Sequence, residues 1–89
     1  MAYDAFLENA QTELDQLVVT GSDDELFASG YLQGHLSLVS GHYELEVEQP
    51  ELAELKNRVQ ASLEQAIAKG ELNEQDQQLV IGLWQRLCA

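Results

Sequence analysis

Residues Ser22–Leu36 read SDDELFASGYLQGHL, and this stretch decides how the chain folds. Ser22 and Glu25 form the S-x-x-E pattern of a capping box, in which each side chain accepts a hydrogen bond from the backbone amide of the other residue. Leu26–Tyr43 then contains no Asp, Glu, Lys or Arg, although 16 of the 89 residues of the chain are acidic. The stretch therefore predicts a helix that begins at Asp23 and in which burial is concentrated.

Three further segments carry apolar residues at three- and four-residue steps, which is typical of amphipathic helices. Gly21 and Gly70 stand where helices are expected to end, and Asn73 stands where one is expected to begin. Pro50 suits the first turn of a helix. The sequence predicts an all-α fold, a single-domain four-helix bundle over residues 1–89 with short connections, and its helices lie at about 3–20, 23–40, 50–69 and 74–87.

The central helix is predicted to end near Gly41, because glycine readily adopts the backbone conformation that follows a helix. Residues 43–48 alternate with period two. This pattern allows a short extended stretch, but the chain offers no partner strand, so we expect 41–50 to be a loop in which Leu45 or Val47 packs onto the bundle.

Along the central helix the polar residues fall on one narrow strip, and apolar residues cover most of the remaining circumference; the strip consists of Ser29, Gln33, Ser37 and Ser40. A helix that is apolar on nearly all sides is typical of the middle of a bundle or of a subunit interface. This helix is therefore the first place to look for a binding surface.

The chain has four basic residues and a formal net charge of −12. Such a charge repels phosphate backbones and anionic lipids, so binding to nucleic acid or to a membrane surface is not expected. The same field attracts basic partners, although in most proteins an acidic surface serves solubility alone. The lone Cys88 excludes an intramolecular disulfide, and the first residues lack the features of a signal peptide, so we expect a cytoplasmic protein.

The densest acidic cluster is Asp23, Asp24 and Glu25. Three carboxylates suit a divalent cation, but negative charge in the first turn of a helix also stabilises the helix itself, and we favour this second explanation. His35 and His42 lie seven residues apart, too far along a helix to chelate one ion. The sequence predicts no metal site, no catalytic residue and no cofactor.

Inside a helix, Gly30 and Gly34 each lower the stability of the helix by about 1 kcal/mol relative to alanine. We expect a contact at these positions to offset this loss. They lie one turn apart on one face. Close packing against another helix of the bundle is the explanation we favour, and a groove for a ligand or a partner side chain is the alternative. In the second case Tyr31 and His35 would be the polar groups beside the groove.

The segment Ser22–Leu36 resembles the YfcL family, small bacterial proteins of about this length. The C-terminal half is similar to the same family at Ser62–Ile67, at Gly70–Leu72, at Asp76 and Gln77, and at Leu79, Val80 and Trp84. The resemblance implies a cytoplasmic bacterial protein from a family without an established activity, and it transfers no catalytic residue. Residues 41–50 lie outside it, so a role for Tyr43, Glu46 or Glu48 would be specific to this chain.

Two hypotheses of function follow. The first is a non-enzymatic protein-interaction or self-association module, a homodimer included, whose candidate face consists of Asp23, Asp24, Glu25, Gly30, Tyr31, Gly34 and His35. The second is a small-ligand or divalent-metal binder that uses the same helix. An enzyme is disfavoured, because a domain of this size rarely encloses the pocket of about 300 Å³ that a ligand site requires.

Overall fold

The computed structural model describes residues 2–89 and is all-α over that range. Its four helices are α1 (Ala2–Thr20), α2 (Asp23–Glu46), α3 (Leu52–Ala68) and α4 (Glu74–Cys88). The predicted fold class, a four-helix bundle with short connections, is confirmed.

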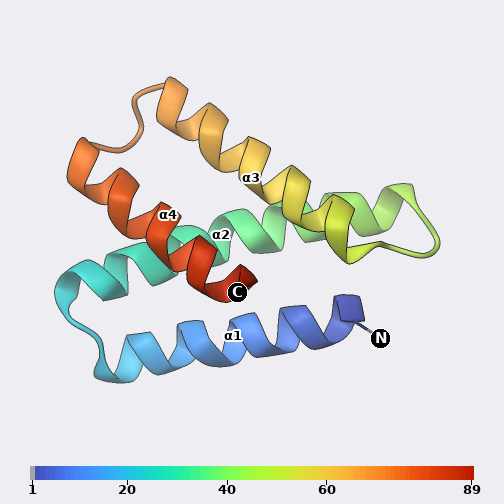
Figure 1. The fold of residues 1–89 in the computed structure, drawn as a ribbon, viewed down its shortest axis with the longest axis horizontal. Helices are drawn as coiled ribbons and strands as arrows, with labels where there is room; N and C mark the ends of the chain where they lie inside the picture. The colour runs from blue at the N-terminus through green and yellow to red at the C-terminus, as the bar shows by residue number, and fades with distance from the viewer. Residues whose placement is uncertain (1) are drawn as a thin grey trace.

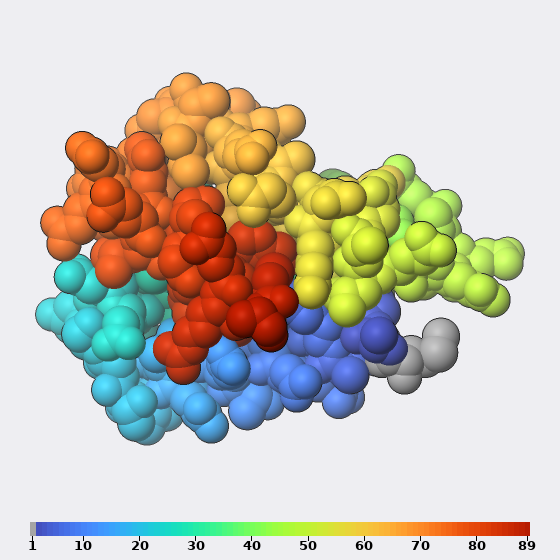
Figure 2. Space-filling view, in the orientation of Figure 1, coloured from blue at the N-terminus to red at the C-terminus, as the bar shows by residue number. Residues whose placement is uncertain are grey.

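Helix α2 is the centre of the arrangement. It packs against each of the other three helices, whereas those three make far fewer contacts with one another. In Figure 1, α3 and α4 cross α2 and α1 runs beside it. In the space-filling view of Figure 2, α1, α3 and α4 form most of the visible face, and α2 shows mainly at its two ends. The three outer helices therefore cover one side of α2.

The covered side of α2 carries every buried residue of that helix: Ala28, Ser29, Leu32, Leu36, Ser40 and Tyr43. Leu32 is completely buried and belongs to a core cluster to which all four helices contribute. The polar strip that the sequence shows is thus split, because Ser29 and Ser40 face the core. The Ser29 hydroxyl donates to the backbone carbonyl of Leu14 at 2.9 Å, which satisfies a buried polar group and fixes α1 against α2.

The predicted end of the central helix at Gly41 is wrong. Helix α2 continues through Gly41 to Glu46, so the first six residues of the expected 41–50 loop are helical. Tyr43 accounts for the extra turns: its ring is buried beside the ring of Tyr3, and its hydroxyl accepts a hydrogen bond from the Glu51 amide at 3.0 Å. These tertiary contacts outweigh the low helix preference of glycine.

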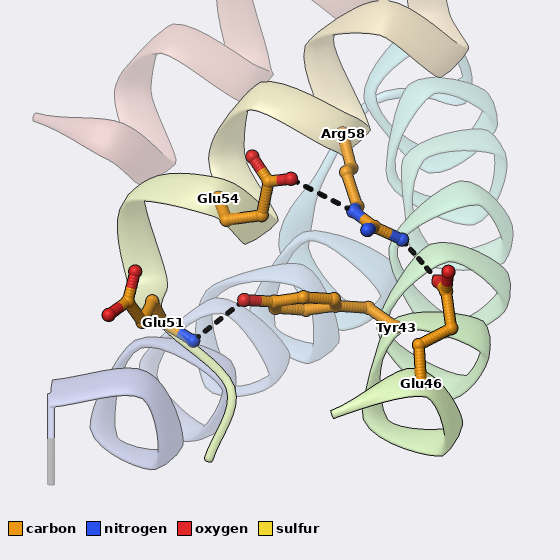
Figure 3. A network of polar contacts seen from close by, with 5 residues as sticks. All are labelled: Tyr43, Glu46, Glu51, Glu54 and Arg58. Carbon is orange, nitrogen blue, oxygen red and sulfur yellow. Dashed lines mark hydrogen bonds and ion pairs between the residues drawn. The ribbon is translucent and has the colours of Figure 1, made fainter. Parts of the chain in front are cut away.

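A polar network holds the end of α2 against α3 (Figure 3). The Arg58 guanidinium lies 4.5 Å from the centre of the Tyr43 ring and forms ion pairs with Glu46 of α2 and with Glu54 of its own helix. These carboxylates raise the pKa of Arg58 above its ordinary value. We expected Leu45 or Val47 to pack onto the bundle; Leu45 is 88% exposed and Val47 is 38% exposed.

The ends of the helices follow local chemistry closely. Ser22 and Glu25 form the predicted capping box, with both hydrogen bonds present at 3.1 and 3.3 Å. The Asn73 side chain accepts from the Asp76 amide at 2.8 Å and caps α4. Gly70 follows α3 with a φ of 78°, the left-handed conformation that glycine adopts readily. The start of α3 is two residues later than predicted, at Leu52 instead of residue 50.

Candidate interaction surface

Most of the side of α2 opposite the core is left open by the described part of the chain, although Tyr31 on this side is half-buried and contacts Glu71. Seven residues lie along the middle of this side, from near the start of α2 to near its end. We call them the open face: Phe27, Gly30, Tyr31, Gly34, Leu38, Gly41 and Leu45. Six of them, without Gly30, follow one another at steps of four, three, four, three and four residues. This spacing places them along one line of the helix, as in the contact seam of a coiled coil.

The open face is both apolar and accessible. Leu38 is 59% exposed and Leu45 is 88% exposed, and Phe27 is also exposed. Tyr31 is half-buried, and its ring lies between those of Phe27 and His35, with ring centres 6.0 and 4.7 Å away. Leucines that stand out between glycines give the surface alternating ridges and hollows, which is the shape that helix packing uses.

Close packing within the bundle does not explain the two glycines, so that interpretation is wrong. A Cβ atom added at Gly30 or at Gly34 would meet no atom within 4 Å, and the same holds at Gly41. The three outer helices pack on the other side of α2, where Leu32 and Leu36 are buried. The glycines therefore leave the backbone of α2 open toward solvent.

We expect Gly34→Ala to raise the free energy of unfolding by about 0.5–1 kcal/mol, because alanine is the better helix former and the space is free. Urea denaturation followed by circular dichroism measures the change. If Gly34→Ala destabilises the protein instead, the space beside this glycine is occupied and the open face is wrongly placed.

The matched control is Gly21→Ala, which we expect to destabilise. A Cβ atom at Gly21 would lie 2.5 Å from the carbonyl oxygen of Leu17 and 3.0 Å from the Cβ atom of Glu25. Backbone must move to relieve that contact, at a cost of about 1–3 kcal/mol. The two substitutions are therefore expected to change the free energy of unfolding in opposite directions.

His35 does not belong to the open face, although the sequence placed it there. Its Nδ1 atom lies 2.8 Å from the hydroxyl oxygen of Ser62, so the ring is hydrogen-bonded to α3. Tyr31 donates from its hydroxyl to a carboxylate oxygen of Glu71 at 3.1 Å. Partial burial, together with this carboxylate, raises the pKa of Tyr31 above its ordinary value. Both side chains thus tie α2 to the segment from α3 to α4.

The three acids at the start of α2 have separate environments. Glu25 is engaged in the capping box, while Asp23 and Asp24 are exposed in the first turn. Within residues 2–89, no three His, Cys, Asp or Glu side chains converge in a way that would hold a metal ion. Of the seven candidate residues, the structure brings Gly30, Tyr31 and Gly34 together on one accessible surface.

An acidic cleft of about 480 Å³ lies between the start of α1 and the end of α2. Its lining combines apolar and acidic side chains: Tyr3, Asp4, Glu44, Val47, Glu48, Gln49 and Pro50. The Tyr3 hydroxyl donates to Glu44 at 2.8 Å, and burial and this carboxylate together raise the pKa of Tyr3 well above its ordinary range. Glu44, which lines the cleft, lies on the part of α2 beyond the predicted helix end, so the sequence prediction missed the cleft.

Two comparisons with known proteins bear on this geometry. The family model described as YfcL protein matches residues 4–89. The chain belongs to the YfcL family. It is also 48% identical over 74 residues to a protein of Escherichia coli (strain K12) that is named Uncharacterized protein YfcL, and the alignment covers 83% of this chain and 79% of that protein. No solved structure matches the chain.

The YfcL match extends the resemblance that the sequence motifs indicated. It runs through residues 41–50, which lay outside those motifs, and so it includes the whole open face and most of the acidic cleft. The relative is uncharacterised, so the comparison assigns no activity to this member of the YfcL family. None of the helices described over residues 2–89 has the length and apolar character needed to cross a membrane.

Proposed function

We propose that the protein is a non-enzymatic interaction module whose open face binds a helix of another protein. The single observation that carries this proposal is the accessible apolar seam on α2, in which Leu38 and Leu45 are more than half exposed. A contiguous apolar surface on a highly charged protein is the usual mark of an interaction site.

Covering the apolar side chains of the open face would contribute favourably to the free energy of binding. Each apolar side chain that leaves water contributes about 25 cal/mol per Å² of buried surface. The seam lies on a helix whose opposite side is packed against three others, so it is held rigid before binding and little order is lost when a partner arrives. A partner helix would place its side chains in the hollows at Gly34 and Gly41.

The experiment that tests this proposal is photo-crosslinking in cells, with a photoreactive amino acid in place of Leu38. Gln65, an exposed residue on α3, provides the matched control position. We expect a discrete adduct from position 38 and none from position 65. The adduct should be lost in a Gly34→Leu background, because a Cβ atom at this position meets no atom within 4 Å and the rest of the leucine would fill the hollow.

Two other results are informative. Equal labelling from positions 38 and 65, or an adduct that survives Gly34→Leu, would show that the open face is not the contact surface. An adduct of twice the mass of the chain would identify the partner as a second copy of the protein. The proposed partner, a helix of another protein, would then be wrong, and the open face would serve self-association.

A further inference from the structure

We infer that the helix bound by the open face is apolar along its middle and basic at both ends. This inference rests on the proposed function and adds the chemistry of the partner to it. The seam from Phe27 to Leu45 is about 27 Å long at 1.5 Å per residue, and no charged residue interrupts the segment Leu26–Tyr43. Acidic side chains stand at both of its ends.

At the first end, Asp23 and Asp24 are exposed in the opening turn of α2. They lie on the same side of the helix as the open face, because Asp23 precedes Phe27 by four residues and Gly30 by seven. Within residues 2–89, neither aspartate forms an ion pair. Their negative charge is therefore available to a cation on a partner.

At the second end, Glu44 directly precedes Leu45 and Glu48 follows it by three residues, and both residues line the cleft together with Asp4. Val47 and Pro50 supply apolar surface there. A lysine or arginine suits such a lining, because its aliphatic stem packs on apolar surface while its charged head reaches carboxylates. Hence the two ends of the seam favour the same charge on a partner.

Over the described residues 2–89, no ion pair engages Asp4, Asp23, Asp24, Glu44 or Glu48. Arg58 pairs with Glu46 and Glu54, and Arg86 pairs with Glu13 at 3.6 Å. The Lys56 ammonium lies 5.1 Å from the centre of the Phe6 ring, on the other side of the molecule from the open face. A second copy of the chain would bring another net charge of −12 and the same acidic ends, so the electrostatic field favours a basic partner.

The test uses three synthetic helical peptides of about 20 residues that share one apolar seam and differ only in their terminal residues. One peptide ends in lysines, one in glutamines and one in glutamates. Binding to the full-length protein is measured by fluorescence anisotropy at about 50 mM and about 500 mM salt. We expect the lysine peptide to bind at least about tenfold more tightly than the glutamine peptide at low salt, and the advantage to shrink at high salt.

Two variants assign the effect to the two parts of the surface. The double variant Glu44→Gln and Glu48→Gln should remove much of the lysine advantage and leave the affinity for the glutamine peptide unchanged. Leu38→Glu should abolish binding of every peptide, and because Leu38 is exposed the variant should remain helical by circular dichroism.

The outcomes separate this inference from the proposed function. If the lysine and glutamine peptides bind equally and Leu38→Glu still abolishes binding, the docking surface stands and the basic partner is wrong. If no peptide binds, or if Leu38→Glu has no effect, both are wrong. If sedimentation equilibrium shows a dimer that Leu38→Glu dissociates, the occupant is a second copy and the inference is overturned.

Discussion

Leu32→Ala is expected to lower the free energy of unfolding by about 2–5 kcal/mol, because it removes a fully buried side chain from the centre of the core. Leu32 lies on the side of α2 that receives the other helices, so the cavity would open in the region that all four helices share. For a domain of this size the midpoint of thermal unfolding should fall by at least about 8 °C. Thermal and urea denaturation followed by circular dichroism measure the change.

Leu38→Ala is the matched control, because it is the same substitution on the opposite side of the same helix. It should change the free energy of unfolding by less than about 0.5 kcal/mol, the usual range for an exposed site. A large loss from Leu38→Ala, or a negligible loss from Leu32→Ala, would mean that α2 is rotated relative to the arrangement described.

Trp84→Ala should have a similar or larger effect, about 3–5 kcal/mol. Trp84 is almost completely buried on α4, its ring meets the ring of Phe6 edge-on at 6.0 Å, and its indole N–H donates to the Gln60 side chain at 3.1 Å. One side chain thus joins α4 to α1 and to α3. Since small domains are stable by only about 5–15 kcal/mol, the variant should show a lower urea midpoint or be unfolded without denaturant.

Trp84→Phe and Gln60→Ala make this prediction quantitative even if the alanine variant does not fold. Trp84→Phe keeps an aromatic ring and loses the hydrogen bond, so its cost should be clearly smaller than that of alanine. Gln60→Ala should cost about 1 kcal/mol, the usual net value of one hydrogen bond. Equal stability of all three variants and the wild type would contradict the placement of Trp84 in the core.

The positions of the helices could be predicted because their ends depend on nearby residues. The capping box of Ser22 and Glu25, the Asn73 cap and the left-handed Gly70 each act within a few residues of the chain. Local chemistry of this kind is written directly into the sequence. The start of α2 was therefore predicted to the residue.

The end of α2 could not be predicted in the same way, because distant residues set it. Tyr43 is held by Tyr3 from one side and by Glu51 and Arg58 from another. Nothing near Gly41 in the sequence indicates these contacts. The alternating pattern of residues 43–48 indicated a loop, but residues 43–46 are helical in the structure and Leu45 is exposed there.

The candidate surface was predicted in part. Gly30, Tyr31 and Gly34 do lie on one accessible face, yet the explanation first favoured for the glycines, close packing in the bundle, is excluded by the open space beside them. Leu38 and Leu45 were missed as members of that face. The spacing of Leu38 from Phe27 and Gly34 was visible within the predicted helix, whereas Leu45 joins the open face only because the helix continues past Gly41.

The contrast between the two sides of α2 links the fold to the proposed function. One side contributes a buried core residue at nearly every turn, and the other presents glycines and exposed leucines without a charge over Leu26–Tyr43. In a chain with a net charge of −12, such a face is the place where another helix can approach with the least desolvation of charged groups.

The most direct test of the account is cysteine labelling at position 38 in purified protein and in cells. The natural Cys88 is first replaced by serine, and Leu38→Cys is compared with Gln11→Cys, which is exposed on α1. We predict that both cysteines react rapidly with a maleimide in the dilute purified protein, and that in cells position 38 becomes strongly protected while position 11 does not. Equally rapid labelling of both positions in cells would contradict the claim that the open face of α2 binds a partner.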